Sequence, residues 1–338
     1  MSALKAKVLV TIPRGLYDLI SRPEDEAKLR SFAEVTFNPY ERNFTEGELS
    51  ELIADADGCI TSWGSPKFTD EVLSMAKRLK IIGHAAGSVK PYVSEAVFKR
   101  GIVVTNAAST ISKSVAEFTL AMILNCLRVI PQHLDAMRRK DWNYRESRVL
   151  TTWDLNGKRV GLIGFGHVAR ELAKLLKPFE VELLVYDPYV EEEHIASYGA
   201  KRSDMMELLS TSDVVSLHLA LTPDTYGIIG EEELRAMKPT AYLVNTSRGA
   251  VVDESALARV LGEGRIAGAA LDVFEQEPLR DDSPLYNLKN VLLTPHIAGP
   301  SDERRKLLFG TVVEDFRRFF SGGRPLNEIS YNRLMFSA

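Results

Sequence analysis

The sequence predicts an α/β protein made of two domains, each a doubly wound parallel sheet covered by helices. From Val8 to Thr105, short runs of β-branched residues alternate with amphipathic segments, which is the pattern of βαβ units. The alternation begins again at Lys158 and continues to Leu293. The length of 338 residues also exceeds the usual size of one hydrophobic core, so two cores are expected.

The expected strands form two series, one for each domain. Helical segments join the strands of each series, and such crossover connections place the strands parallel in one sheet. The first series covers residues 8–12, 35–37, 58–61, 79–83 and 102–105, and the second covers residues 158–163, 181–186, 213–217, 241–245, 266–271 and 291–293.

Two longer helical segments complete the expected organisation. Residues 112–140 are apolar around more than a narrow stripe, which predicts packing on several neighbours, including a second subunit. A polar turn after the last strand leads into a final helix over residues 303–320, which is expected to return to the first domain. We therefore expect one domain from residues 1–106 and 299–338 and a second from residues 107–298.

Composition and charge argue against several classes of partner. The chain has 42 basic and 46 acidic residues, without the basic excess that nucleic-acid binding requires. Cys59 and Cys126 fit no zinc spacing and are interpreted as reduced core thiols, so no metal is expected. The N-terminus lacks a signal-peptide pattern, and the apolar segment 118–130 is too short to span a bilayer. These features predict a cytoplasmic protein without a membrane or nucleic-acid partner.

A glycine-rich turn at the start of the second series indicates a dinucleotide site. A buried strand runs into a GxGxxA pattern in which Gly164 allows a tight turn, Gly166 lets a pyrophosphate approach, and Ala169 allows close packing. The next strand ends at Asp187, where a carboxylate can bind the ribose hydroxyls and repel a 2′-phosphate. NAD is therefore expected rather than NADP. The alternative is that the glycines only connect strand to helix and that Asp187 caps a turn before Pro188.

Three later strand ends carry polar residues in apolar surroundings, where open α/β sheets bind ligands. Arg248 can bind a carboxylate through two hydrogen bonds and polarise the adjacent carbonyl. His296 can exchange the proton that accompanies hydride transfer, and Glu277 can orient the imidazole ring and favour its protonated form. Taken singly, each residue has a structural alternative, such as a surface ion pair or a solvated loop carboxylate.

The motifs around these residues resemble those of the D-isomer-specific 2-hydroxyacid dehydrogenase family, which includes glyoxylate and hydroxypyruvate reductases and phosphoglycerate dehydrogenase. The family's VAE segment, glycine loop with a downstream acid, and SHLPLTPET-like segment are similar to residues 115–117, 164–187 and 216–225, with Ala220 where proline is usual. Its NxxRG, DVFxxEP and PHxxG motifs correspond to the three strand ends.

This resemblance implies a Rossmann-type cofactor domain inserted into a discontinuous, flavodoxin-like substrate domain, and a homodimer built through the cofactor domain. It also implies a small 2-hydroxy or 2-oxo acid substrate, with Arg248 binding the substrate, His296 donating the proton and Glu277 as its partner. Thr246 and Asp272 are similar to residues beside the nicotinamide, and His167 and Val168 to residues over the pyrophosphate. Further expected cofactor residues are His218, Leu219, Ala298 and Gly299.

The substrate loop departs from the family pattern. Backbone amides of a GxGxD loop hold the substrate carboxylate in the family, but here Ala86, Gly87 and Ser88 are followed by Val89 and Lys90 in place of the acid. The arginines near the phosphate in phosphoglycerate dehydrogenases align with Trp63 and His84, and the sequence ends at Ala338, where regulatory domains would follow. We therefore expect an unphosphorylated, glyoxylate- or hydroxypyruvate-like substrate that contacts residues 86–88 and Trp63. The alternative for Trp63 is a half-buried aromatic without substrate contact.

Three other functions stay open at this point. Phosphoglycerate dehydrogenase is disfavoured by the missing arginines. An NAD-sensing corepressor similar to the C-terminal-binding proteins would share the fold and the three polar residues without turnover. Formate dehydrogenase is weaker, because that branch resembles a His–Gln pair and Glu277 stands in place of the glutamine.

Overall fold

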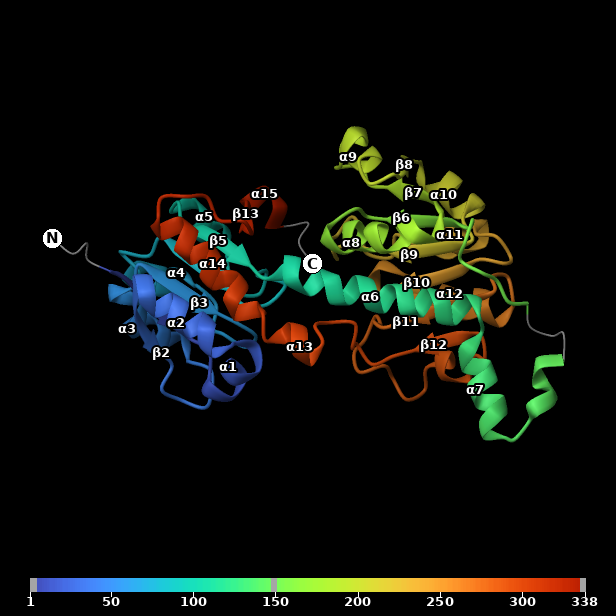
Figure 1. Cartoon of the computed structure of the whole chain (residues 1–338), viewed down its shortest axis with the longest axis horizontal. Helices are drawn as coiled ribbons and strands as arrows, with labels where there is room; N and C mark the ends of the chain where they lie inside the picture. Colours follow the sequence, from blue (N-terminus) through green and yellow to red (C-terminus); the bar gives the residue numbers. More distant parts are fainter. Residues whose placement is uncertain (1–4, 147–150, 335–338) are drawn as a thin grey trace. The chain divides into compact units, whose positions relative to one another are not determined.

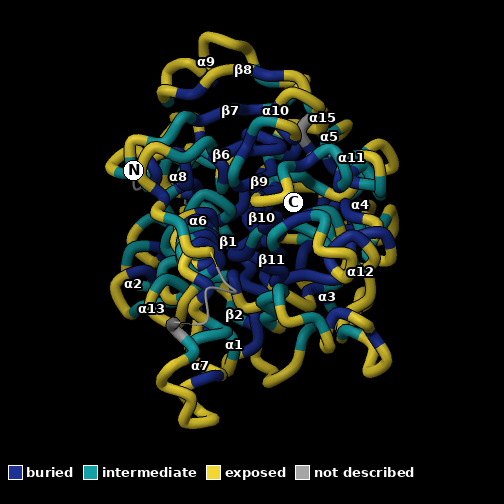
Figure 2. Tube along the Cα trace, turned by 90° about the vertical axis from the view of Figure 1, so that its right-hand side faces the viewer, coloured by how far each residue is buried: buried dark blue, intermediate teal, exposed yellow. Residues whose placement is uncertain are grey.

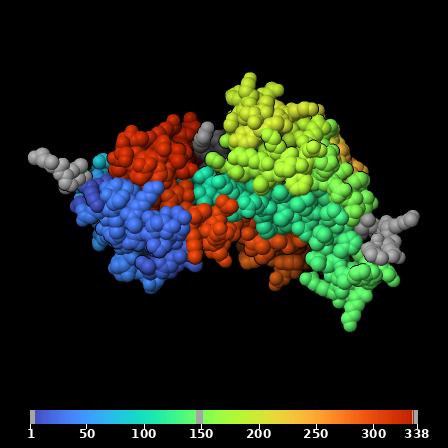
Figure 3. Space-filling view, viewed as in Figure 1, coloured from blue at the N-terminus to red at the C-terminus, as the bar shows by residue number. Residues whose placement is uncertain are grey.

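The computed structural model describes residues 5–146 and 151–334. The chain forms two compact units, unit 1 from Met1–Ser112 with Pro300–Ala338 and unit 2 from Lys113–Gly299. Segments from both ends of the chain, blue and red in Figures 1 and 3, belong to unit 1, where helix α14 packs against α2. The first division falls within helix α6 (Ala108–Leu127), a few residues after the expected position. Both units are α/β with a largely parallel sheet, which confirms the predicted fold class.

Unit 1 contains a six-stranded sheet in the order β13-β5-β4-β3-β1-β2. Its parallel part has the strand order 2-1-3-4-5 of flavodoxin-like sheets. The short edge strand β13 is antiparallel to β5 and was not predicted. The strands are β1 (Ala6–Val10), β2 (Ala33–Phe37), β3 (Gly58–Thr61), β4 (Ile81–His84), β5 (Val103–Asn106) and β13 (Glu328–Ile329).

Unit 2 contains a seven-stranded parallel sheet in the order β12-β11-β10-β9-β6-β7-β8. Numbered from β6, the first six strands have the order 3-2-1-4-5-6 of the Rossmann fold, and β12 extends the sheet beyond them. The strands are β6 (Arg159–Ile163), β7 (Glu182–Tyr186), β8 (Lys201–Arg202), β9 (Val214–Leu217), β10 (Tyr242–Asn245), β11 (Gly268–Leu271) and β12 (Val291–Leu293).

Helices cover both faces of each sheet, so each sheet has a hydrophobic core on either side. Figure 2 shows this burial as dark blue along the strands and yellow on the outer helices and loops. The helices of unit 1 are α1 (Arg14–Ile20), α2 (Pro23–Phe32), α3 (Glu46–Leu52), α4 (Asp70–Met75), α5 (Glu95–Lys99), α13 (Asp302–Arg305), α14 (Leu308–Phe320) and α15 (Tyr331–Leu334). After α6, unit 2 contains α7 (Ile130–Arg138), α8 (His167–Leu176), α9 (Glu192–Ala196), α10 (Met205–Thr211), α11 (Glu231–Ala236) and α12 (Glu254–Gly262).

The single helix expected over residues 112–140 is wrong, because the chain forms α6 and α7 with a break between them. Val129, at the break, adopts a left-handed conformation with φ 45°. Pro131 has no N–H to donate to the carbonyl of Leu127, and its ring would collide with that carbonyl in a continuous helix. The amide of Trp153 donates to the Leu127 carbonyl instead, at 2.8 Å. The carbonyl freed by the proline is thus satisfied from another segment.

The final helix is also interrupted, since the expected segment 303–320 divides into α13 and α14. α14 lies on the sheet of unit 1 and buries Phe309, Val312 and Phe316 completely. A glycine in β4 makes this close packing possible. A Cβ at Gly83 would lie 2.2 Å from Val312 and 2.6 Å from Phe316.

Among the described residues, no single helix is long and apolar enough to cross a membrane. The pair α6 and α7 together passes the test of length and composition, but the two helices are bent by 66° at their break.

Candidate functional site

The glycine loop lies at the carboxyl end of β6 and leads into α8. Gly164 has a φ of 89°, and a Cβ there would lie 2.6 Å from the carbonyl oxygen of His218. A Cβ at Gly166 would meet no atom within 4 Å, so the backbone at this position is open to a ligand. Ala169 is fully buried against the sheet. Together with the N–H groups of the first turn of α8, which includes His167 and Val168, this geometry fits a pyrophosphate.

Asp187 follows β7 and is hydrogen-bonded to the glycine loop. One carboxylate oxygen accepts from the Phe165 amide at 2.7 Å, and the other accepts from the Tyr189 amide at 2.9 Å. Asp187 thus caps a turn that includes Pro188 and Tyr189, and it also contacts the loop between the two glycines. Each carboxylate oxygen retains acceptor capacity, which suits the hydroxyls of a ribose.

His218 and Leu219 lie at the carboxyl end of β9, next to the glycine loop. The Nε2 atom of His218 lies 3.0 Å from the hydroxyl oxygen of Ser216. Desolvation lowers the pKa of His218 to about 3, so its ring is neutral at physiological pH.

Arg248 follows β10 in a turn that Asn245 organises. The Asn245 side-chain oxygen accepts from the amide and the hydroxyl of Ser247 at 3.0 and 2.9 Å, and its Nδ2 donates to the Arg248 carbonyl at 2.9 Å. Gly249 comes next, where a Cβ would lie 1.8 Å from the carbonyl carbon of Phe274. Only glycine therefore lets the Arg248 turn pack against the loop that carries Glu277.

Asp272, at the end of β11, builds the loop that carries His296. Its fully buried carboxylate accepts from the Thr294 hydroxyl at 2.7 Å and from the amides of Ile297 and Ala298 at 2.9 and 2.8 Å. The His296 amide donates to the Asp272 carbonyl at 2.9 Å. These contacts hold His296 at a φ of 54°, a conformation that non-glycine residues rarely adopt.

His296 and Glu277 form a close pair. The Nδ1 atom of His296 lies 2.6 Å from a Glu277 carboxylate oxygen, and the other Glu277 oxygen accepts from the Phe274 amide at 3.1 Å. The His296 side chain is 51% exposed, and within the described chain its Nε2 atom makes no hydrogen bond. Desolvation lowers the pKa of Arg248, and the negative charge of Glu277 opposes this shift. Unit 2 thus brings together the three predicted reactive residues.

The expected substrate loop belongs to unit 1, where Ala86, Gly87 and Ser88 follow β4. The Asn106 side chain donates to the Gly87 carbonyl and holds the loop. Within the described chain the amides of Gly87 and Ser88 have no acceptor, so they are available to an anion. A pair of consecutive free N–H groups is typical of anion sites.

Trp63 lies beside this loop in unit 1 and is 38% exposed. Its neighbours in sequence fix its position, because Ser62 donates to the Ala85 carbonyl at 3.2 Å and the Gly64 amide donates to the Tyr92 hydroxyl at 3.1 Å. His84 is buried below the loop, with Nδ1 2.9 Å from the Thr61 hydroxyl. Burial lowers the pKa of His84 to about 3, so it carries no charge.

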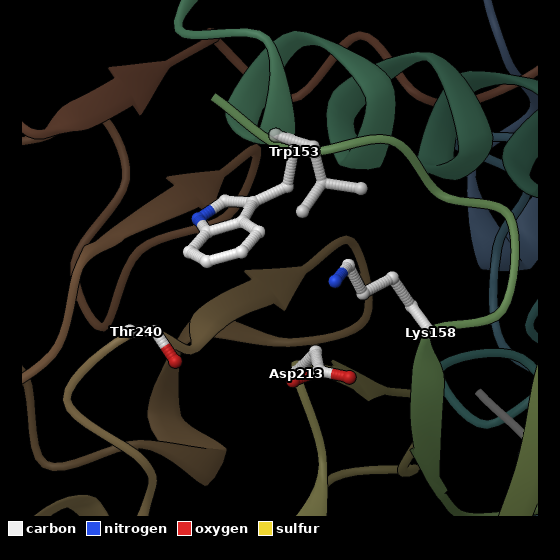
Figure 4. Close-up of a pocket in the computed structure, with 5 residues that line it drawn as sticks. Trp153, Lys158, Asp213 and Thr240 are labelled. Carbon is white, nitrogen blue, oxygen red and sulfur yellow. The ribbon is translucent and has the colours of Figure 1, made fainter. Parts of the chain in front are cut away.

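A hollow at the opposite, amino end of the unit 2 sheet is lined by Trp153, Lys158, Asp213 and Thr240 (Figure 4). The Lys158 ammonium lies 4.6 Å from the centre of the Trp153 ring. Asp213 accepts from the Arg159 amide at 2.9 Å and from the Lys238 ammonium at 3.0 Å. These groups are thus engaged in structural contacts. Across residues 5–146 and 151–334, no group of three or more His, Cys, Asp or Glu side chains is placed to hold a metal ion.

Several residues that build the site were not assigned a role from the sequence. Asn245 and Gly249 lie within the NxxRG motif but had no assigned role, although an Asx turn and a close approach are ordinary reasons for these residue types. Thr119 on α6 was not considered; its hydroxyl lies 2.8 Å from that of Thr246. No local pattern indicates that contact, because 127 residues separate the two threonines.

The fold and the glycine loop define a dinucleotide-binding protein. The family described as "D-isomer specific 2-hydroxyacid dehydrogenase, NAD binding domain" matches residues 120–298. The chain belongs to this family, as its motifs indicated, and is an NAD-dependent oxidoreductase of that class.

The chain is similar in sequence or in structure to proteins with different names. A glyoxylate reductase of Korarchaeum cryptofilum is 38% identical over 284 residues, which cover 83% of this chain and 85% of that protein. A D-3-phosphoglycerate dehydrogenase of Methanocaldococcus jannaschii is 37% identical over 92% of this chain, but the match spans only 59% of that relative. A crystal structure of a glyoxylate reductase from Paecilomyes thermophila superposes with a TM-score of 0.79 at 27% identity, covering 97% of this chain and 99% of that one.

Proposed function

We propose that this protein uses NADH to reduce an unphosphorylated small 2-oxo acid, of the glyoxylate or hydroxypyruvate type, to the 2-hydroxy acid. The observation that carries this proposal is the His296–Glu277 pair, in which His296 Nδ1 lies 2.6 Å from a Glu277 carboxylate oxygen at the carboxyl edge of the sheet. A positioned imidazole with a carboxylate partner is the usual device for moving one proton in such a reaction.

Arg248 and His296 have separate roles in the proposed reaction. Arg248 binds the substrate carboxylate through its planar guanidinium and polarises the carbonyl at the 2-carbon. When bound, the cofactor supplies the hydride. The alkoxide that results takes a proton from Nε2 of His296, the ring atom that Glu277 does not engage. In the opposite direction neutral His296 accepts the proton from the hydroxyl.

The substrate loop supports an unphosphorylated substrate. We propose that the amides of Gly87 and Ser88 hold the substrate carboxylate and that Trp63 contacts the substrate. The two positions that align with the phosphate-binding arginines hold no cation, since Trp63 is apolar and His84 is buried and neutral. The names of the relatives leave phosphoglycerate as the main alternative substrate.

A panel of 2-oxo acids assayed with NADH tests this proposal. Glyoxylate and hydroxypyruvate should have higher kcat/KM values than 3-phosphohydroxypyruvate. Trp63→Arg is a matched variant, because it restores a cation at the position and should selectively raise activity on the phosphorylated acid. A preference of the native protein for 3-phosphohydroxypyruvate would contradict the proposal. NADH binding without turnover of any 2-oxo acid would favour the corepressor-like alternative.

We also propose a homodimer formed through unit 2. α7 places Ile130, Leu134 and Met137 on one face with their side chains exposed, and Trp142 is exposed just beyond that helix. Exposed apolar residues clustered at helical spacing are typical of interaction surfaces. Light scattering should give twice the monomer mass for the native protein and a smaller mass for Leu134→Asp. A native monomer would refute the dimer.

A further inference from the structure

The hydroxyls of Thr119 and Thr246 form a buried pair whose hydrogen-bond direction is fixed by counting protons. The Thr119 hydroxyl lies 2.7 Å from the carbonyl oxygen of Val115, one turn earlier in α6. A carbonyl can only accept, so the single proton of Thr119 points to Val115. The Thr246 hydroxyl lies 2.8 Å from the Thr119 oxygen, and no other proton is available for this contact. Thr246 must therefore donate to Thr119.

This direction determines what Thr246 can offer to a ligand. Its one proton is used on Thr119, so the oxygen retains only lone pairs for any other partner. Both hydroxyls are buried, and within the described residues Thr246 has no second hydrogen bond. Thr246 is thus an obligate acceptor, and a ligand group beside it must be a donor. A ligand donor forms a hydrogen bond with Thr246, whereas a ligand acceptor at this position leaves a buried polar group unsatisfied. The two ligands therefore differ in binding free energy by the cost of that unsatisfied group.

The order of the strands indicates which part of the cofactor reaches Thr246. The glycine loop follows β6, and the strands then run β9, β10, β11 and β12 across the sheet. Thr246 follows β10, whereas His296 follows β12. A dinucleotide with its pyrophosphate at β6 and its nicotinamide near His296 must cross the end of β10 with its nicotinamide half. This step rests on the proposed role of His296.

We propose that Thr119 is a positioning residue for the cofactor: because it takes the Thr246 proton, the Thr246 hydroxyl can only accept, and its partner is the carboxamide N–H of the nicotinamide. The carboxamide has both a donor and an acceptor end, so it could bind in two orientations related by a half turn. An acceptor-only hydroxyl favours the orientation in which the N–H₂ group faces β10. Thr119 thereby helps fix the ring that carries the hydride, without touching it.

Cofactor analogues test this proposal by binding alone, without turnover. In 3-acetylpyridine adenine dinucleotide a methyl group replaces the N–H₂ group, whereas thionicotinamide adenine dinucleotide keeps it. The native protein should bind the acetylpyridine analogue about 5–10-fold more weakly than NAD⁺, the loss expected for one hydrogen bond, and should discriminate less against the thio analogue. Calorimetry or fluorescence titration measures all three dissociation constants.

Substitutions at the two threonines should remove this discrimination. Thr119→Val and Thr246→Val should each bring the ratio of dissociation constants for the acetylpyridine analogue and NAD⁺ close to one. Thr119→Ser should keep the native ratio, because serine retains the hydroxyl. The double valine variant should be no worse than Thr246→Val alone, since the two residues act as one unit. ADP-ribose, which lacks the nicotinamide, should bind all folded variants with the native dissociation constant.

Several results would overturn the proposal. These are a native ratio in Thr119→Val, additive losses in the double variant, or no discrimination by the native protein. If Thr119→Val does not fold, the near-isosteric Thr246→Val still tests the acceptor. Loss of 2-oxo acid turnover with an intact analogue ratio would instead count against the proposed reaction, so the two failures are distinguishable.

Discussion

Replacing Asp272 by asparagine should destabilise unit 2 and displace His296, although the two side chains have nearly the same size. The fully buried Asp272 oxygens accept from the Thr294 hydroxyl, the Ile297 amide and the Ala298 amide, and the bond to Ala298 is itself buried. The asparagine oxygen can accept from the Thr294 hydroxyl and the Ile297 amide, as one Asp272 oxygen does now. The asparagine N–H₂ group then faces the Ala298 amide, so two hydrogen-bond donors lie against each other without an acceptor.

The magnitude follows from these contacts. A buried donor without an acceptor costs about 1–3 kcal/mol. The two remaining bonds lose their charge assistance, roughly half the strength of each, which adds about 1–2 kcal/mol. We therefore expect a loss of about 2–5 kcal/mol in the free energy of unfolding. Because the same bonds hold His296 in its left-handed conformation, kcat should also fall while NADH still binds.

Urea unfolding gives the stability of Asp272→Asn, and hydrogen exchange at the Ile297 and Ala298 amides reports the loop directly. Asp253→Asn is the matched control, because Asp253 caps α12 by accepting from the Ala256 amide and asparagine caps a helix equally well. The control should change the free energy of unfolding by less than about 0.5 kcal/mol. Equal stability and equal amide protection in the two variants would refute the reasoning.

Three further predictions concern the reaction. Arg248→Lys should lower kcat/KM roughly 10–100-fold, because a point charge cannot replace the planar guanidinium; near-native kcat/KM with normal NADH affinity would remove Arg248 from the site. Asp187→Ser should shift the ratio of kcat/KM for NADH over NADPH toward NADPH by about tenfold or more, and an unchanged ratio, or a native preference for NADPH, would exclude Asp187 as the selector. His296→Ala should cost on the order of 10²–10⁴ in kcat without weakening NADH binding. Glu277→Gln should also lower kcat, because the neutral glutamine amide replaces the carboxylate that accepts from Nδ1 of His296 and orients the ring. Near-native reduction by His296→Ala, or an unchanged kcat in Glu277→Gln, would contradict the proton-transfer step.

The strands were predictable because their signal is local. A strand that is buried on both faces of a parallel sheet has a short, continuous apolar sequence. The predicted apolar segments coincide with observed strands within a few residues. The break between α6 and α7 had a local signal as well, since Pro131 follows an apolar helix. The two-residue edge strands β8 and β13 had no such signal and were not predicted. The position of β13 depends on the buried carboxylate of Asp315, which accepts from the amides of Leu326 and Asn327 and belongs to a separate helix.

The same distinction between local signals and long-range contacts applies to the site. Gly164, Asp187, Arg248, Glu277 and His296 could be selected from the sequence, because each stands at a strand end and its chemistry belongs to its own side chain. The geometry that makes them useful depends on contacts between distant segments, which no periodicity encodes.

Asp272 shows this difference most clearly. It was selected as a residue beside the nicotinamide, yet in the structure its carboxylate is hydrogen-bonded to the loop of the following strand. That loop fixes the backbone of His296, and Glu277 fixes the ring through Nδ1, so the two carboxylates constrain one histidine from two directions. A histidine held in both its backbone and its ring loses little entropy when it delivers a proton, which is the condition for efficient acid catalysis. The sequence therefore indicates the groups that we propose to react, and the fold determines how firmly each is held.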